Sequence, residues 1–521
     1  MRTSDLLLLI KSLSKAERRN FRLQATKQDG SEPAYLALYE ELEIVSDKWE
    51  PGIGVPDVDE NVLEENLRQK NVEGPIPAMK NYLPKAIFKS LRQLYEKNSK
   101  RSEIEVDLRD ALILENRGLL GLASGKLNDA LDMALQYEYH ALAFDILQHL
   151  IRIETQADFK SYAESIGKRL EKISEITRFL DAEARQFIAY YRAFLQFRLG
   201  MARETIPAGE RVPQAGPGAP TPTFLAKMYQ CQLLSMEALF QGNTREAMEK
   251  GDELLSLWEK EPEIKNERLG QYIRHFSNYL NFCIAERSFE RFEYHLNVLK
   301  AMNRKASATV DLEAELEQNI LLAEQLLYLN TDRLEEACAI FPRVEDALKK
   351  YGTKINRARE ITLRYNNIIA LFALARYEQA LGQCLDLISM RHHAHRHDLQ
   401  LLGKILEIII HFELRDHQYL NNLVSKLGRP FQHARESRDF ERMLLRHLLK
   451  IAEIQVQDLD TVQERKLNAA LFEQFHRDLT QYKSAAPAKF QIGLEEIMIW
   501  VKSKVEGKSF REILKKNWDK K

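Results

Sequence analysis

The chain contains 521 residues, of which 45% are hydrophobic and 29% are charged, while glycine and proline number only 21 and 15. A hydrophobic fraction of this size can bury a large core and excludes a chain that is disordered throughout. The 76 basic and 77 acidic residues nearly cancel, so the chain as a whole lacks the positive excess of typical nucleic-acid-binding proteins. Few helix breakers and many charges for the solvent faces of helices predict an all-α protein.

The apolar and cysteine patterns favour a reduced, cytoplasmic protein. The apolar run at residues 6–10 is too short for the core of a signal peptide, and no later stretch approaches the ~18 apolar residues of a membrane span. No CxxC pair occurs among the four cysteines, which are Cys231, Cys283, Cys338 and Cys384. We therefore expect buried, reduced thiols and no contact with a membrane.

Residues 1–102 are predicted to form an N-terminal helical head. Ser14 and Glu17 have the spacing of a capping box, which predicts the start of a helix. Apolar residues at helical spacing predict a second helix through residues 33–44 and a long helix through residues 79–94.

From about residue 104, a small or aromatic anchor residue recurs, most often at the end of a Gly-x-x-x-x-Ala pattern or of a variant with arginine at its start. The eight anchors are 32 to 45 residues apart and are Ala130, Tyr162, Thr205, Ala247, Phe292, Ala337, Ala380 and Leu420. Such a period is typical of helical hairpins that stack because none can bury its apolar face alone. We predict an α-solenoid over residues 103–205 and 224–430, followed by C-terminal helical repeats and a cap at 431–521.

Two sets of residues carry a resemblance to known repeat proteins. Tyr377 and Ala380 match the turn-side aromatic and the small residue of tetratricopeptide repeats, and Gly118 matches the small residue of their first helix. The segments Leu9–Ser14 and Lys80–Leu83 resemble a group of uncharacterised bacterial helical-repeat proteins. The resemblance implies TPR-like hairpins but no activity.

Residues 206–223 interrupt the helical pattern. Five prolines and three glycines fall within them, and these residue types remove helical hydrogen-bond donors and stiffness. We predict a surface loop between two repeats, with a hinge between two arms as the alternative.

Four histidines lie between His392 and His397. On a helix His393 and His397 share one face, a geometry that holds a transition metal, but Arg391 and Arg396 disfavour a cation there. We expect a solvated polar turn, with a metal or pH-sensing site as the alternative. Because the sequence contains no catalytic motif, we predict a non-enzymatic protein without a cofactor or a bound metal.

The head carries two rows of basic residues. One row follows the capping box and the other lies on the long helix: Lys15, Arg18, Arg19 and Arg22, then Lys85, Lys89 and Arg92. If both rows face one side, they form a patch suited to the phosphates of nucleic acid. A solvated face and a site for an acidic protein partner are the alternatives, because acidic residues balance the charge of the head as a whole.

Asparagine recurs fourteen positions before three of the anchors, at Asn116, Asn278 and Asn366. In TPR-like hairpins this position faces the inner groove, where an amide can bind the backbone of an extended peptide. Arg274 and Arg364 lie close in sequence and can supply charge. These five residues are the predicted peptide-binding site; packing contacts or coincidence are the alternative explanations of the repeated asparagine.

Together these patterns predict a scaffold that binds a protein or peptide partner in the groove of the solenoid. The alternative is a nucleic-acid-binding regulator in which the head contacts DNA and the repeats sense a partner. An enzyme with an irregular pocket is a third hypothesis, which no motif supports. The sequence identifies neither the partner nor the pathway, and it leaves a homo-oligomer open.

Overall fold

Helices account for all regular structure in the described part of the chain, which confirms the predicted all-α class. Almost all of the predicted loop at 206–223, and most of the histidine cluster at 392–397, lie outside the described residues. A computed structural model describes residues 2–26, 33–49, 55–70, 72, 74–96, 99–157, 159–202, 223–302, 309–390, 396–416, 419–420, 439–456, 461–485 and 493–519.

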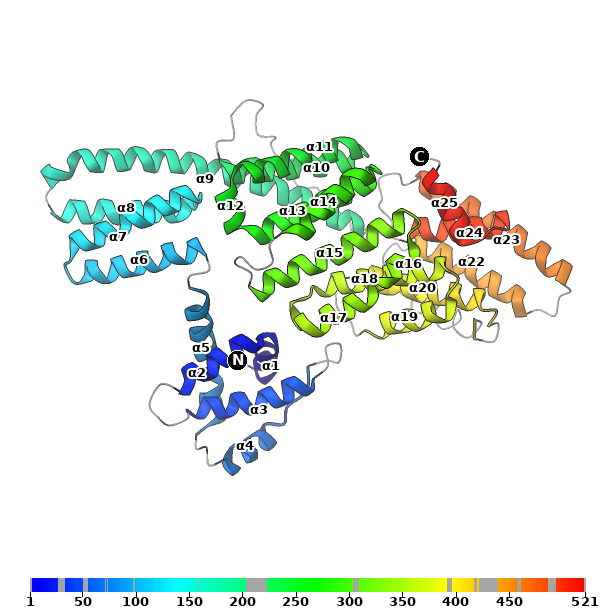
Figure 1. The fold of residues 1–521 in the computed structure, drawn as a ribbon, viewed down its shortest axis with the longest axis horizontal. Coiled ribbons are helices and arrows are strands. Elements are labelled where there is room, and N and C mark those ends of the chain that lie inside the picture. Colours follow the sequence, from blue (N-terminus) through cyan, green and yellow to red (C-terminus); the bar gives the residue numbers. More distant parts are fainter. Residues whose placement is uncertain are drawn as a thin grey trace.

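Helices α1 to α5 form the N-terminal head, which lies below the rest of the molecule in Figure 1. Their bounds are Thr3–Ser12, Lys15–Thr26, Ala34–Lys48, Glu60–Gln69 and Ile76–Tyr95. The predicted capping box is present, since Ser14 N donates to Glu17 Oε2 at 2.5 Å and Glu17 N donates to Ser14 Oγ at 3.3 Å. Phe21 packs on Tyr39 at a ring distance of 4.8 Å, within a cluster of buried side chains that belong to the head alone. The head therefore has its own hydrophobic core.

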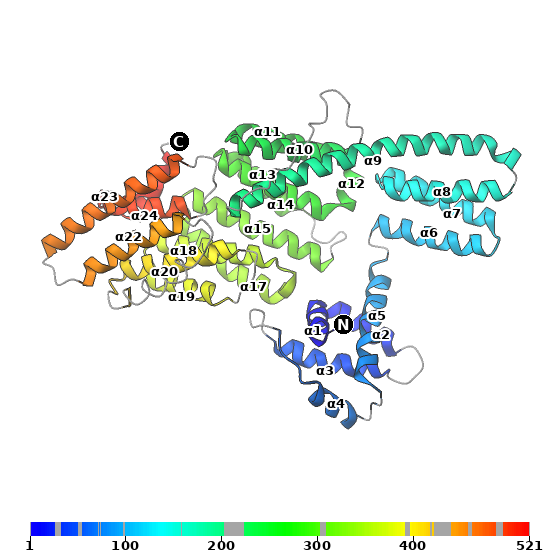
Figure 2. The same cartoon turned by 180° about the vertical axis from the view of Figure 1, so that it is seen from behind.

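Helices α6 to α9 form one end of an elongated array (Figure 1). Their bounds are Lys100–Asn116, Leu120–Gln136, His140–Ala157 and Phe159–Ala202. Helix α9 has 44 residues and extends beyond its partner α8 to reach α10, as Figure 2 shows from behind. Phe187 and Tyr190 of α9 contact Tyr229 of α10 at ring distances of 5.3 and 5.8 Å. One long helix thus joins the end of the array to its middle.

Helices α10 to α15 form the middle of the array, where each packs against its neighbours in the chain. Their bounds are Phe224–Phe240, Thr244–Lys260, Pro262–Glu267, Leu269–Ala285, Phe289–Ala301 and Val310–Asn330. In their core the indole Nε1 of Trp258 donates to His275 Nδ1 at 3.0 Å. Burial lowers the pKa of His275 to about 3, so this acceptor is neutral.

Helices α16 to α25 form the other end of the array. Trp500 of α24 lies in a buried cluster with α18 and α20, and Arg511 Nε of α25 donates to Asp332 Oδ1 at 2.8 Å. The C-terminal helices therefore fold back onto α16 and α18 (Figure 1). The bounds of α16 to α25, with the 3-10 helix η1 in its place, are Leu334–Ala339, Phe341–Tyr351, Gly352–Lys354 (η1), Arg357–Ala373, Tyr377–Ser389, His397–Glu413, Asp439–Val456 (α22), Thr461–Ala485, Leu494–Glu506 and Phe510–Asp519.

One turn geometry recurs between successive helices. At each turn the N–H that follows a left-handed residue donates to the carbonyl five residues earlier, at 2.7 to 3.1 Å, and closes the C-terminus of the helix. In the described part of the chain, eight residues with positive φ mark these turns: Gly118, Glu138, Gly242, Arg287, Asp332, Ala375, Arg415 and Gly507. From Gly242 to Arg415 the turns are 40 to 45 residues apart, in agreement with the period of the anchors.

Half of the eight predicted anchors lie at one position, the fourth residue of the helix after a turn, and Thr205 lies outside the described residues. Four of them hold this position and are fully buried: Ala247, Phe292, Ala337 and Ala380. The prediction was wrong for Ala130, because Ala130 is the eleventh residue of α7 and Gly125 lies inside that helix instead of in a turn. Gly118, matched above to the first helix of a repeat, is the turn residue itself at φ 73°, and Ala123 is the buried fourth residue of α7.

None of the described helices combines the length and the hydrophobicity that crossing a membrane requires. All four cysteines are free thiols. Cys283 and Cys384 are buried, while Cys231 and Cys338 are half-buried. Burial raises the pKa of each thiol above its ordinary value, so all four are protonated at neutral pH.

Candidate functional site

A groove of about 510 Å³ lies where α16, α17, α18 and α19 converge. Helix α18 lies between the other two walls, one from α16 and α17 and one from α19. The lining residues are Cys338, Phe341 and Pro342 on the first wall, Asn367 and Leu371 on α18, and Arg376, Gln379, Gly382, Gln383 and Asp386 on the turn and helix of α19. The groove therefore combines apolar surface with three amide side chains and one charge of each sign.

Two amides of the groove each have a polar atom without a partner. Asn367 is only 3% exposed, and its buried Oδ1 accepts no hydrogen bond from the described residues. Gln383 Oε1 is also buried and without a donor in that part of the chain. An unpaired buried acceptor costs about 1–3 kcal/mol, and most buried polar groups in native proteins have a partner. Both residues line the groove, and the two unpaired oxygens are themselves shielded from solvent.

The groove is open beside Gly382 of α19. A Cβ atom at Gly382 meets no other atom within 4 Å, so the space beside it is free for a ligand. Arg376 precedes the first residue of α19, and Asp386 lies ten residues later, about 15 Å along the helix axis. Neither side chain forms an ion pair within the described residues, so the two ends of this wall carry opposite, uncompensated charges.

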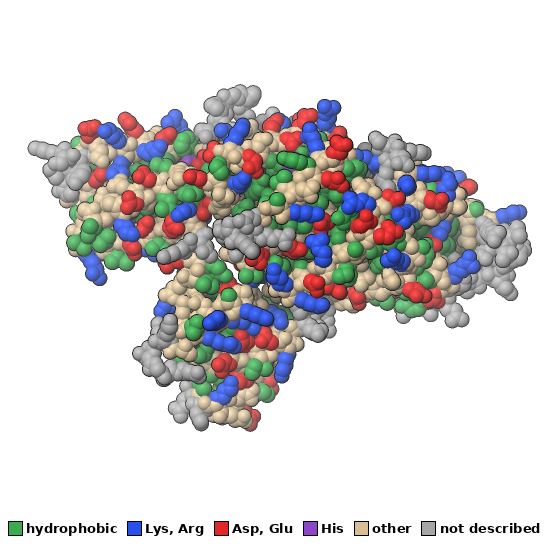
Figure 3. Space-filling view, in the orientation of Figure 1, with side chains coloured by type: hydrophobic (Ala, Val, Ile, Leu, Met, Phe, Trp, Pro, Cys, Tyr) green, Lys and Arg blue, Asp and Glu red, His purple; other side chains and the backbone are tan. Residues whose placement is uncertain are grey.

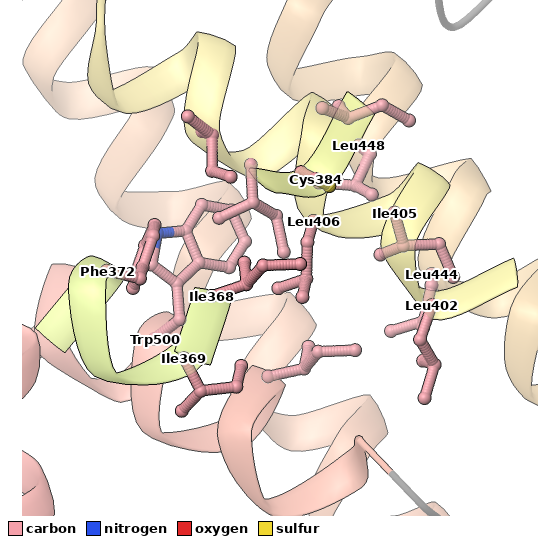
Figure 4. Close-up of a cluster of buried hydrophobic side chains, with 14 of the residues drawn as sticks. Ile368, Ile369, Phe372, Cys384, Leu402, Ile405, Leu406, Leu444, Leu448 and Trp500 are labelled. Atoms are coloured by element: carbon pink, nitrogen blue, oxygen red, sulfur yellow. The ribbon is translucent and has the colours of Figure 1, made fainter. Parts of the chain in front are cut away.

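Two of the helices that line the groove, α18 and α19, pack with their other faces against the core shown in Figure 4. Ile368 and Phe372 of α18 and Cys384 of α19 belong to this cluster, together with Trp500. Cys384 Sγ also donates to the carbonyl oxygen of Gly403 at 3.0 Å. The walls of the groove are therefore held in place before any ligand binds.

The three asparagines predicted to form a repeated site lie in different surroundings. Asn278 and Asn366 do occupy equivalent positions, each seven residues before the end of its helix, α13 or α18. Asn116 is instead the last residue of α6, so its place in the series was wrong. Asn278 is exposed, whereas Asn366 is 9% exposed with its Nδ2 unpaired among the described groups. Helix α15 packs between α13 and α18, which separates the two equivalent asparagines (Figure 1).

The two predicted arginines also lie apart. Arg274 is exposed on α13, while Arg364 Nε on α18 donates to Glu360 Oε1 at 3.1 Å. None of the five predicted peptide-binding residues lines the groove. Asn367, the residue directly after Asn366, lines the groove instead. Successive side chains on a helix point about 100° apart, so the two asparagines face different directions.

A second cleft, of about 880 Å³, lies between the head and the array. Its head side is the turn before α2 and α2 itself, and its other side is α17 with η1. Figure 3 shows Lys and Arg side chains gathered on the head where it faces the array. Eight lining side chains are basic and two are acidic: Lys11, Lys15, Arg18, Arg19, Arg22, Lys349, Lys350 and Lys354, with Glu43 and Asp47. We call the cleft lined by these ten charged residues the basic cleft.

The two predicted basic rows of the head lie in different places. The row on α2 lines the basic cleft, but Lys85, Lys89 and Arg92 are exposed on α5 and line no part of it. Another face of α2 packs on α5, where Asn20 Nδ2 donates to Ser90 Oγ at 3.0 Å. The row on α2 instead meets lysines of α17 and η1, more than 300 residues later in the sequence.

No group of three or more His, Cys, Asp or Glu side chains with a metal-binding arrangement occurs in the described residues. Of the histidine cluster, only His397 falls in a described helix, as the first residue of α20, and residues 391–395 lie outside the described part. The groove and the basic cleft are thus two candidate functional sites in the described part of the chain. No family model, curated protein or solved structure matches this chain.

Proposed function

We propose that the protein is a non-enzymatic α-solenoid scaffold of TPR-like hairpins that binds an extended segment of a protein partner in the groove between α16 and α19. The observation that carries the proposal is the pair of buried amide oxygens, Asn367 Oδ1 and Gln383 Oε1, which lack donors. The recurrent turns and buried anchors support the repeat architecture. We propose that this scaffold acts in the cytoplasm.

An extended peptide supplies what the groove lacks. Its backbone carries one N–H donor per residue, so two donors can pair with Asn367 Oδ1 on α18 and Gln383 Oε1 on the neighbouring α19 once these amides turn toward the ligand, without any demand on the peptide's side chains. Gln379 is exposed one turn before Gln383 on α19, and its amide can donate to or accept from the same backbone. Phe341, Pro342 and Leu371 supply apolar surface for a side chain of the ligand.

The charged ends of α19 set a direction for the ligand. An extended chain rises about 3.3 Å per residue, so the ~15 Å between Arg376 and Asp386 corresponds to four or five residues. We expect bound peptides to place an acidic residue near Arg376 and a basic residue four or five positions away, near Asp386.

The chemistry of the groove supports binding over catalysis. Cys338 is the one residue of the groove lining with a thiol or hydroxyl side chain, and burial raises the pKa of this thiol. A protonated thiol is a poor nucleophile. The alternative function, a regulator whose head contacts DNA, has weaker support, because the described part of the head contains no strand of a winged helix and three of its seven predicted contacts lie outside the basic cleft.

Selection from a random-peptide display library tests the proposal. Peptides selected on the full chain should lose at least about tenfold in affinity for Gly382→Leu, because the leucine fills the groove. The variant should fold, since glycine disfavours the interior of a helix by about 1 kcal/mol relative to leucine.

Gly125→Leu is the matched control. Gly125 is an exposed helical glycine with no atom within 4 Å of its Cβ position, and it lies on α7, away from the groove. This variant should bind the selected peptides as the unmodified chain does. Equal binding by Gly382→Leu, or equal loss in both variants, contradicts the proposal.

A further inference from the structure

The basic cleft has two walls of the same charge. Lys11, Lys15 and Arg19 come from the head, and Lys349 and Lys350 come from α17 on the other side. Like charges across a cleft repel, and partial removal from water strengthens the repulsion. The head nevertheless docks here, with α1 in contact with η1.

Four of the eight cations are ion-paired to acidic side chains. Arg18 Nη1 lies 2.7 Å from Asp47 Oδ1, Arg22 pairs with Glu43, and Lys354 Nζ lies 2.6 Å from Asp311 Oδ1. The fourth, Lys350, is 3.7 Å from Glu313. These pairs use both acidic residues of the cleft lining and two beyond it.

The other four cations have no acidic partner among the described residues: Lys11, Lys15, Arg19 and Lys349. Lys11 Nζ donates to the carbonyl oxygens of Ser46 at 2.7 Å and Trp49 at 2.9 Å, and burial lowers its pKa. Lys15, Arg19 and Lys349 are exposed and form no ion pair in that part of the chain. The cleft therefore holds an excess of positive charge that only a ligand or counter-ions can neutralise.

We propose that the basic cleft binds a small phosphate-bearing anion of the di- or triphosphate class, which bridges the head and α17. A phosphate chain concentrates several negative charges in a small volume, and its oxygens accept from donors on all sides, as cations on two facing walls require. Lysine and arginine are the ordinary protein ligands for phosphate. The volume of about 880 Å³ lies in the range of small-molecule sites.

Titration calorimetry of the full chain with inorganic tripolyphosphate tests this site. We expect one phosphate chain per protein, and an affinity that falls as sodium chloride rises from about 0.05 M to about 0.3 M. The triple variant Lys15→Gln, Arg19→Gln and Lys349→Gln should weaken binding at least about 100-fold, because it removes charged donors from both walls. All three residues are exposed, so the variant should fold.

A second triple variant removes the same charge elsewhere on the head. Lys85→Gln, Lys89→Gln and Arg92→Gln lie on α5, outside the cleft, and should change the affinity less than about twofold. Equal weakening by the two triple variants, binding of many phosphate chains per protein, or unchanged binding by the cleft variant overturns the proposal.

Parallel titrations identify the class of ligand. Adenosine triphosphate that binds more tightly than tripolyphosphate assigns a nucleotide to the cleft, and equal binding assigns the phosphate chain alone; both support the proposal. A poly-glutamate peptide or a single-stranded RNA that binds more tightly than either, through the same three residues, overturns it in favour of a macromolecular partner.

Discussion

Several residues adopt a backbone conformation or a protonation state that the surrounding helices impose. Ala375, Arg287 and Asp332 adopt left-handed backbone geometry without being glycine, because the turns between helices require it. His275 is a second example, since it is 7% exposed and its Nδ1 accepts from Trp258. Protonation of His275 removes that acceptor and buries a charge at once.

His275 should therefore make the stability of the protein depend on pH. Its pKa is about 3 in the folded protein, below the ordinary value of 6.5, so below pH 6.5 the unfolded chain binds a proton that the folded chain does not. The stabilisation is present above pH 6.5 and is lost as the pH falls toward 3. Relative to His275→Gln, which keeps an acceptor for Trp258, the unmodified chain should lose about 2 kcal/mol between pH 7.5 and pH 5.

Urea unfolding at the two pH values measures this difference. The other histidines are common to both proteins, so they cancel in the comparison. Parallel curves of unfolding free energy against pH for the two proteins contradict the assignment of a buried neutral imidazole at position 275.

At the scale of the element, the anchors show what the sequence can predict. Where the anchor is the fourth residue of its helix, as at Ala247 and Ala380, the local pattern identifies the turn correctly. It failed at Ala130 because Gly125 resembles a turn signal, although Ala123, Leu127, Ala130 and Ala134 are buried at helical spacing. That spacing outweighs an exposed glycine, and it is the signal that could have corrected the prediction.

The candidate sites depend on contacts that no local pattern contains. The repeat pattern in the sequence selects Asn366, whereas Asn367 lines the groove, because packing decides which face of α18 meets α19. The pattern of basic residues finds the cations of α2 but misses Lys349, which reaches the basic cleft only through tertiary structure. The residue types were thus recognisable, whereas their convergence was not.

Asn367→Leu separates a binding amide from a packing amide. Because Asn367 Oδ1 has no partner among the described residues, its removal should leave the unfolding free energy unchanged or raise it by about 1 kcal/mol. Affinity for peptides selected on the unmodified chain should fall about tenfold, since the ligand loses an acceptor.

Asn319→Leu provides the contrast. Asn319 is 2% exposed on α15, accepts from Ser277 Oγ at 2.5 Å and donates to the carbonyl oxygen of Glu315 at 2.5 Å. Its loss should lower stability by about 1–3 kcal/mol with little effect on peptide affinity. Calorimetric melts and binding isotherms of both variants decide the matter, and an Asn367→Leu protein that is destabilised yet still binds refutes the role given to Asn367.

At the scale of the whole molecule, carboxylates join helices that are distant in sequence. Glu267 of α12 accepts from the backbone N of Lys100 at 3.0 Å and from Tyr139 OH at 2.7 Å, which ties both α6 and the start of α8 to the middle of the array. Glu138 accepts from the backbone N of Phe224 at 2.8 Å and so caps α10. These contacts and the long α9 hold the array as one body that presents the groove at one end and the basic cleft beside the head.

Site-specific photo-crosslinking shows where on the protein a selected peptide binds. A photoreactive residue replaces Gln379 in the groove, Lys349 in the basic cleft or Leu122 on α7; all three positions are exposed. A peptide selected on the full chain is then irradiated with each protein. We predict a crosslink from position 379 and none from 349 or 122, whereas crosslinks from 349 or 122 without one from 379 contradict peptide binding in the groove.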